Sequence, residues 1–528
     1  MPAHTLGAAS TLLQNGEMRR FELDGKAVVV ARVEDQYHAF RASCTHYGGP
    51  LNEGVLKGHT VMCPWHHACF DIRTGARTEP PALSDLPTFS LRIEDGNVVV
   101  DVDQPGAKPA TPQRESDSRT FVIVGGGAAG EAAAEELRRE GFTGNIVLLS
   151  ASPLLPIDRP NVSKDYLNGH ARPEWMPLRG AGWYPDRNIV LRLNETVTGV
   201  DTPNRRVMLA SGESLAFDGL LLATGGTPRT LNIPGHDLSN IFLLREQPDA
   251  DRIIQSVGEG SGKRAVIIGA SFIGMEAASS LASRGVQITV VGMEALPFER
   301  IFGAEIGRLF QREHEANGIQ FRLSSGIERF VSDDGRVTGV ELKGGEVLPA
   351  DFVVVGVGVT PATAFLADSG LALGERDKSV LVNDQLQASV PEVYAAGDIA
   401  RFTDKTGGRV RIEHWRLAQQ HGMIAAHNLL DKDDGMTHHV PFFWTTQWDL
   451  TVSYVGHAEA WDEIVYRGTL DAKDFIAFYV QGGKLLAAAG AGRDRELCAI
   501  EFMLRDDVPL SVEQMRDEGF DLVAHSQQ

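Results

Sequence analysis

Two segments of the chain share one plan, a strand followed by a glycine turn and a helix, and this repeat limits the fold more than any other feature. The first reads TFVIVGGGAAGEAAAEELRREG from Thr120, and the second reads KRAVIIGASFIGMEAASSLASRG from Lys263. Glycines allow a tight turn and a close approach of the backbone to a phosphate at the start of a helix. The repeat therefore predicts two related α/β nucleotide-binding domains.

Paired cysteines and histidines form a second pattern near the N-terminus, in CTHYGGPLNEGVLKGHTVMCPWHHACF. One residue separates Cys44 from His46, and two separate Cys63 from His66. Two thiolates and two imidazoles suit either a zinc ion or a [2Fe–2S] cluster. Structural zinc sites usually space their first pair more widely, so the tight pair at Cys44 favours a cluster held between two loops.

These loops resemble those of the Rieske family, which read Cys-x-His and Cys-x-x-His. The resemblance implies that Cys44 and Cys63 hold the inner iron, and that His46 and His66 hold the outer iron. Three further side chains are expected to pack beside the loops or to lie at the surface, namely His67, Cys69 and His59.

The loops also depart from those of respiratory Rieske proteins. Gly49 and Trp65 stand where those proteins carry two extra cysteines, and Ala68 stands where they carry a serine that donates to a cluster sulfur. Fewer hydrogen bonds to the sulfurs predict a potential near the low end of the Rieske range, about −150 mV.

Composition restricts the classes of partner and of location. The formal net charge of −20 argues against nucleic acid as a partner. No segment reaches the roughly 18 apolar residues of a membrane span, and the N-terminus lacks the pattern of a secretory signal. Four cysteines do not make a disulfide framework, so we expect a reducing cytoplasm.

Four motifs follow in order after the linker-like stretch QPGAKPATPQRESDS, and together they resemble flavoprotein reductases of the glutathione-reductase fold. They are VIVGGGAAGEAA, LLATGGTPR, VVVGVGVTP and YAAGDIA. PIDRPNVSK and EHWRLAQQHGMIAAHNLL narrow the resemblance to ferredoxin-reductase-like and apoptosis-inducing-factor-like members. With a Rieske domain in front, the chain resembles the apoptosis-inducing-factor-3-like group.

The resemblance implies a multidomain fold with an all-β Rieske domain, two α/β Rossmann-like domains and a C-terminal α+β domain. The expected division is 1–104 for the Rieske domain, 105–118 for a linker, 119–240 and 361–432 for the FAD-binding domain, 241–360 for the NAD(P)H-binding domain, and 433–528 for the C-terminal reductase domain.

The same resemblance assigns residues to FAD. Gly125, Gly127 and Gly130 should cradle the pyrophosphate, and Asp398 should bind the ribityl or pyrophosphate region. The residues expected beside the flavin are Arg159, Lys164 near N5, Thr224, Gly225, Glu413, His414, Trp415 and, covering the ring from the third domain, Trp444. Core packing is the alternative for Trp444.

One departure concerns the adenosine ribose, which an acidic residue usually binds at the end of the second strand. This chain has Ser150, Ala151 and Ser152 there. Serine binds a ribose less strongly than an acidic residue does, so the resemblance does not fix how tightly FAD binds.

The second glycine turn contains Gly269, Ser271 and Gly274 and is expected to bind NADH. Glu294 follows the next strand, and no Arg or Lys stands beside it to meet a 2′-phosphate, which favours NADH over NADPH. Glu276 matches a glutamate near the nicotinamide and is expected to pair with Lys164 as a catalytic unit; a solvent-facing glutamate is the alternative.

These features predict an NADH-dependent iron–sulfur flavoprotein. The Cys-x4-Cys pair of dithiol reductases is missing, and Cys498 stands alone, so electrons should leave through the cluster and its exposed histidines. An oxygenase or another acceptor protein would receive them. The alternatives are an NADH-sensing protein, as the likeness to apoptosis-inducing factor permits, and a flavin oxidase with the Rieske domain as a docking module. No oligomeric state is predicted.

Overall fold

The N-terminal domain of the computed structural model, which describes residues 3–258, 262–405, 407–436 and 439–528, is built of strands. Its larger sheet is antiparallel, in the order β1 (His4–Ala8), β10 (Asn97–Pro105), β9 (Thr88–Glu94), β4 (Gln36–Arg41), β3 (Lys26–Val33) and β2 (Met18–Leu23). A smaller sheet contains β5 (Val55–Lys57), β6 (Thr60–Met62), β7 (Cys69–Asp71) and β8 (Arg77–Glu79).

Strand β3 shows why this domain has two cores. Its sequence KAVVVARV is apolar on both faces. Val29 and Ala31 pack toward the smaller sheet, while Val28 and Val30 pack on the opposite face. Alternate residues of a strand point to opposite sides, so one valine-rich strand supplies both layers.

The next domain holds a five-stranded parallel sheet. Its order is β13 (Ile189–Arg192), β12 (Asn145–Leu149), β11 (Thr120–Val124), β17 (Gly219–Leu222) and β29 (Val393–Ala395). Helices α1 (Ala128–Arg139) and α8 (Trp415–Leu429) pack against each other beside it. Because β29 and α8 come late in the chain, residues between them and β17 form an inserted domain.

The inserted domain also contains a five-stranded parallel sheet. Its order is β19 (Ile241–Leu243), β26 (Phe352–Val355), β20 (Arg264–Ile268), β21 (Gln287–Val291) and β22 (Gln320–Arg322). Helix α5 (Phe272–Ser283) follows β20 as α1 follows β11. The predicted pair of strand–glycine–helix units is present at these two places.

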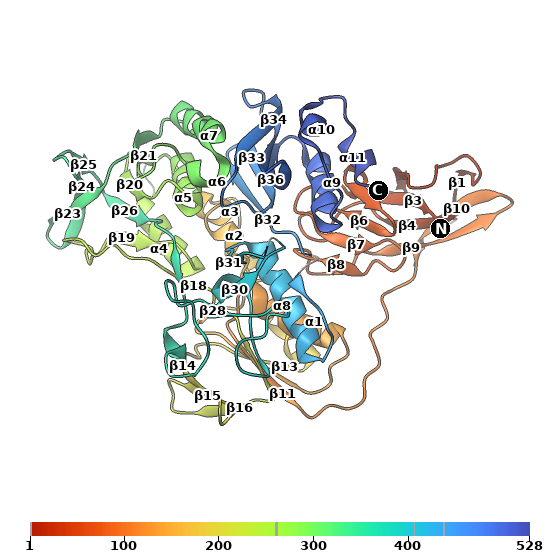
Figure 1. Cartoon of the computed structure of the whole chain (residues 1–528), viewed down its shortest axis with the longest axis horizontal. Helices are drawn as coiled ribbons and strands as arrows, with labels where there is room; N and C mark the ends of the chain where they lie inside the picture. Colours follow the sequence, from red (N-terminus) through yellow and green to blue (C-terminus); the bar gives the residue numbers. More distant parts are fainter. Residues whose placement is uncertain (1–2, 259–261, 406, 437–438) are drawn as a thin grey trace.

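The C-terminal domain lies between the inserted domain and the N-terminal domain (Figure 1). Its antiparallel sheet runs β32 (Phe442–Gln447), β33 (Leu450–Gly456), β36 (Lys484–Ala491), β35 (Asp474–Gln481) and β34 (Glu463–Thr469), with α9 (Asp494–Arg505) packed on it. The predicted fold class is confirmed. Within the described residues, no helix has the length and apolar character that crossing a bilayer requires.

Candidate functional site

The two cysteine–histidine loops connect strands of the N-terminal domain and meet at one point. Backbone bonds close each loop, from Cys44 N–H to the Gly49 carbonyl at 2.8 Å and from Cys63 N–H to the Ala68 carbonyl at 2.9 Å. The Nδ1 atoms of His46 and His66 lie 3.1 Å apart.

The four side chains form a donor set that suits a mixed-ligand cluster. A hydrogen bond between the buried thiols lowers the pKa of Cys44 and raises that of Cys63. Burial lowers the pKa of His46 to about 3, so its ring is the neutral form that binds metals. Two sulfurs and two imidazole nitrogens that converge in this way fit a [2Fe–2S] cluster.

Trp65 fills the space where an extra cysteine would stand in respiratory-type loops. A Cβ added at Gly49 would lie 2.7 Å from Cys63 Sγ and 3.2 Å from the Trp65 ring. The absence of a side chain at position 49 therefore lets the indole of the second loop pack against the first loop.

A cavity of about 1360 Å³ lies where the two α/β domains meet the C-terminal domain. The predicted residues that line it are Gly127, Arg159, Lys164, Gly225, Gly269, Ser271, Glu276, Glu294, Asp398, Glu413, His414, Trp415 and Trp444. Four predicted cofactor residues are not among the lining residues: Gly125, Gly130, Thr224 and Gly274. The structure thus brings most of the predicted residues to one place.

Those four residues shape the turns. A Cβ at Gly130 would lie 1.9 Å from the Gly125 carbonyl oxygen, and one at Gly274 would lie 2.0 Å from that of Gly269. Gly125 has φ +117°, and the Thr224 hydroxyl donates to the Ala362 carbonyl at 2.8 Å. They allow strand, turn and helix to pack closely beneath the cavity, and their contact with a cofactor stays a prediction.

The start of α1 fits the pyrophosphate of FAD. Gly127 precedes the helix, and the Arg159 guanidinium reaches over it, with Nη1 3.1 Å from an added Cβ. Arg159 Nη2 contacts Glu246 Oε1 at 2.5 Å, while its buried Nε has no partner among the described residues. A free donor beside a glycine-led helix start is suited to bind an anion.

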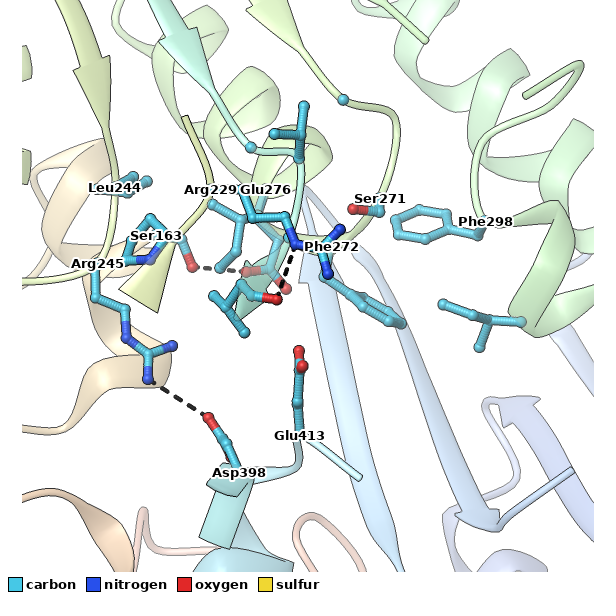
Figure 2. A pocket seen from close by; sticks show the side chains of 18 of the residues that line it. Ser163, Arg229, Leu244, Arg245, Ser271, Phe272, Glu276, Phe298, Asp398 and Glu413 are labelled. Carbon is cyan, nitrogen blue, oxygen red and sulfur yellow. Dashed lines mark hydrogen bonds and ion pairs between the residues drawn. The ribbon is translucent and has the colours of Figure 1, made fainter. Parts of the chain in front are cut away.

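The next group lies beside the position that the resemblance gives to the flavin. Arg245, which the sequence reasoning missed, points its Nη2 at Asp398 Oδ2 at 3.4 Å (Figure 2). Burial raises the pKa of Glu413 despite the Arg411 guanidinium, and burial lowers the pKa of His414 to about 3. His414 is therefore neutral, and its Nδ1 is buried without a partner in the described structure.

Lys164 and Glu276 face each other, with Nζ 2.9 Å from Oε2. Glu276 is 3% exposed, which rules out the solvent-facing alternative. It also accepts hydrogen bonds from Ser163 Oγ at 2.6 Å and Thr445 Oγ1 at 2.8 Å (Figure 2 shows the Ser163 contact). Ser163 and Thr445 were missed because only the fold brings them to a helix of the inserted domain.

Two basic residues line the same cavity as Glu294. Glu294 lines the cavity after β21, as expected. Arg300 and Lys343 line it too, although neither neighbours Glu294 in the sequence. The expectation of no Arg or Lys concerned the positions beside Glu294, and these two residues come from other parts of the chain.

Trp444 connects the cavity to the cysteine–histidine loops. Its indole lines the cavity, and its ring centroid lies 4.2 Å from that of His66 and 6.4 Å from that of His46. The Tyr47 hydroxyl donates to Asp158, next to Arg159. The histidines, expected at an exposed tip, are half-buried and face the reductase domains.

At the end of β12, Ser150 is buried and its Oγ accepts from the Ser152 backbone N–H at 3.3 Å. The serine thus supports the turn. Positions 150–152 contain no carboxylate that could bind the adenosine ribose.

Comparison with known proteins gives three family matches. Residues 119–422 match the pyridine nucleotide-disulphide oxidoreductase family, residues 4–90 the Rieske [2Fe-2S] domain, and residues 442–525 the reductase C-terminal domain.

Relatives match most of the chain. Apoptosis-inducing factor 3 of Mus musculus is 35% identical over 91% of this chain and 80% of its own length. Rhodocoxin reductase of Rhodococcus erythropolis is 33% identical over 76% of this chain and 93% of its own. In the crystal structure of the covalent putidaredoxin reductase–putidaredoxin complex, a 31% identical chain superposes with a TM-score of 0.74, covering 78% of this chain and 98% of that one.

The matched families imply FAD, NAD(P)H and a [2Fe-2S] cluster, each of which the described residues fit. The chain belongs to the pyridine nucleotide-disulphide oxidoreductase family, as an FAD-dependent, ferredoxin reductase-like NAD(P)H oxidoreductase that carries its own Rieske domain.

Proposed function

We propose that the protein takes electrons from NADH and delivers them, through FAD and its own Rieske cluster, to a separate acceptor protein. One observation carries this proposal. Trp444 lines the nucleotide cavity on one side and packs 4.2 Å from the His66 ring on the other. A single aromatic side chain therefore spans the distance between the two expected cofactor sites.

The chain's own residues would bind and orient the cofactors. When bound, FAD accepts hydride from the nicotinamide and releases electrons one at a time, and the cluster carries them singly. Gly127 and Arg159 would hold the pyrophosphate. Glu276 fixes Lys164 at the cavity wall, so the ammonium keeps one position. Cys44, Cys63, His46 and His66 would hold the cluster.

NADH is the proposed donor, because the Glu294 carboxylate can bind ribose hydroxyls and repels a 2′-phosphate. Arg300 and Lys343, which share the cavity, would then meet the pyrophosphate. Replacing Glu294 by Ala should reduce the ratio of kcat/KM for NADH over that for NADPH. An unchanged ratio would contradict the assignment.

The proposed acceptor is an oxygenase or another one-electron protein. Support comes from relatives named as ferredoxin reductase components of dioxygenase and demethylase systems. We also propose a cytoplasmic location, and its only support is that the four cysteines do not make a disulfide framework.

A redox sensor is the second candidate, because similarity to apoptosis-inducing factor 3 covers 91% of the chain. A sensor would form a long-lived reduced complex with NADH and turn over slowly with cytochrome c or ferricyanide. Many turnovers per second would favour the reductase.

The test is an anaerobic titration of the purified holoprotein with NADH, followed by absorbance and low-temperature EPR. We expect flavin bleaching together with a rhombic signal whose average g is ~1.9, the signature of mixed His/Cys ligation. Bleaching without that signal would overturn the proposed path and favour the sensor or the oxidase.

A His66→Ala variant separates the path from the oxidase alternative. If the path is right, NADH still bleaches the flavin, while one-electron transfer to an acceptor is lost. Survival of both reactions would contradict the path.

A further inference from the structure

Helix α9 of the C-terminal domain contacts the second cluster loop of the N-terminal domain at two points. Cys498 Sγ lies 3.5 Å from the carbonyl oxygen of Cys63. Glu501 Oε2 lies 2.5 Å from Nδ1 of His67. Residues three apart share one face of a helix, so both side chains reach the loop together.

The contacted loop is held tightly. His67 is 0% exposed, stacks on Phe442 with centroids 4.0 Å apart, and donates its backbone N–H to the Cys63 carbonyl at 3.1 Å. That carbonyl therefore has two donors, one from its own loop and one from Cys498. His67 directly follows the ligand His66.

Glu501 is a charged group in this buried place. It is 2% exposed, and its Oε1 pairs at 2.8 Å with Arg416 Nη2 from α8. Burial alone raises the pKa of Glu501, but Arg416 and His67 outweigh it and lower the pKa, so the side chain is a carboxylate. Cys498 is fully buried, and its Sγ–H donates to the Cys63 carbonyl.

We propose that α9 tunes the reduction potential of the Rieske cluster from the neighbouring domain, with Glu501 lowering the potential and Cys498 raising it. The inference rests on the proposed cluster site. Reduction adds negative charge, so a nearby carboxylate disfavours it, and a hydrogen-bond donor on a ligand's backbone favours it. The two side chains thus act in opposite directions on one loop.

The experiment is a dithionite redox titration of full-length holoprotein variants, with the cluster EPR signal as the readout. Glu501→Gln should shift the midpoint potential upward, and Cys498→Ala should shift it downward. Cys498→Ser keeps a donor and should stay nearer the wild type than Cys498→Ala.

Glu136→Gln is the matched control, because Glu136 is also buried and pairs with Arg77 of the N-terminal domain at 3.2 Å, away from α9. Its midpoint potential should equal that of the wild type. An equal shift in Glu136→Gln would mean general loosening of the domain contact and would overturn the inference.

Unchanged potentials in both Glu501→Gln and Cys498→Ala would also overturn it. If Glu501→Gln does not fold, the comparison of Cys498→Ala with Cys498→Ser tests the inference by itself. A wild-type protein without a Rieske signal would instead overturn the proposed function, so the two failures are distinguishable.

Discussion

Trp444 is the residue whose replacement tests the electron path directly. Trp444→Leu removes the aromatic contact with His66 while keeping an apolar side chain. We expect cluster reduction by NADH to slow by about tenfold or more, equivalent to about 1.4 kcal/mol in the barrier, with flavin bleaching unchanged. Rapid-mixing absorbance and freeze-quench EPR would measure both steps.

Trp461→Leu is the control for that variant, because Trp461 lies in the same domain and contacts Tyr479 instead. It should leave both rates unchanged. Equal cluster-reduction rates in Trp444→Leu and the wild type would remove Trp444 from the path.

Glu276 is the second residue whose replacement is predicted, because it affects both stability and flavin reduction. Glu276→Gln leaves the Lys164 ammonium without its counter-charge, and breaking a buried ion pair costs about 3–5 kcal/mol when one partner remains. Lys164 is 17% exposed, so we expect the lower end of that range. Both the melting temperature and the rate of flavin bleaching by NADH should fall.

The exposed pair Glu305–Arg308 offers a comparison, since both side chains are half exposed or more. Glu305→Gln should change neither quantity measurably. A Glu276→Gln variant that behaves like Glu305→Gln would show that the buried pair contributes little.

Helix α8 connects the flavin side to the cluster side. Trp415 at its start lines the cavity, while Arg416 is fully buried and donates Nε to the Pro80 carbonyl of the N-terminal domain at 2.9 Å. Gln420 donates to Glu79 at 2.7 Å. Movement of this helix would therefore disturb both sites at once.

The contact of α8 with α1 depends on Gly422, where an added Cβ would lie 2.2 Å from the Ala129 carbonyl oxygen. Gly422→Ala should push the helices apart, at a cost of about 1–3 kcal/mol, and weaken FAD retention at the start of α1. The melting temperature and the flavin content per chain would report this. Gly180→Ala is the control, because nothing lies within 4 Å of its Cβ; if both variants kept their flavin equally, the packing argument would fail.

The end of α8 holds a titratable group with a predictable pH effect. His427 lies between Asp434, 2.6 Å from Nδ1, and Glu136, 3.2 Å from Nε2. Burial lowers its pKa, but these carboxylates outweigh burial and raise the pKa to about 9. Protonated His427 therefore stabilises the fold fully below about pH 6.5, and this stability is lost as the pH rises through about 9.

His427→Gln should accordingly lower the melting temperature most at pH 6, where the protonated histidine contributes up to about 3 kcal/mol. The difference from the wild type should shrink at pH 9.5. A difference that stays constant with pH would contradict the charged form.

The N-terminal domain shares a core with the C-terminal domain. Val55, Met62 and Cys69 pack with Phe442 and Cys498 in one buried cluster. Buried ion pairs adjoin it, including Arg416 with Glu501. We therefore expect the Rieske domain to stay docked rather than to swing on the linker.

A protease site placed in residues 106–118 tests this expectation. After cleavage, the two fragments should co-elute in gel filtration at both low and high salt, because buried pairs are screened little. Arg416→Ala should release the Rieske fragment, since it removes the hydrogen bond to the Pro80 carbonyl and takes the guanidinium away from buried Glu501. Lys57→Ala, at the more exposed pair with Asp506, should not. Separation of the wild-type fragments would show a mobile domain.

Local patterns made much of the fold predictable. The glycine turns at Gly127 and Gly269 and the spacing of Cys44, His46, Cys63 and His66 are short-range signals, because each motif needs only its own loop. Arg245, Thr445 and Lys343 have no such signal, since they reach the cavity from other elements. The sequence shows Cys498 only as a lone cysteine; it is buried, and its contact with Cys63 depends on a domain boundary that no local pattern encodes.

The core shared by the N-terminal and C-terminal domains can be completed only late in synthesis. The N-terminal domain leaves the ribosome first, but β32 and α9, which cover its second loop, are made more than three hundred residues later. At about 5–20 residues per second, that delay is on the order of tens of seconds. Until then Val55, Met62 and Cys69 lack their partners, and Cys63 and His66 are uncovered. We expect cluster insertion to occur in this interval, before the last strand and helix close over the loop.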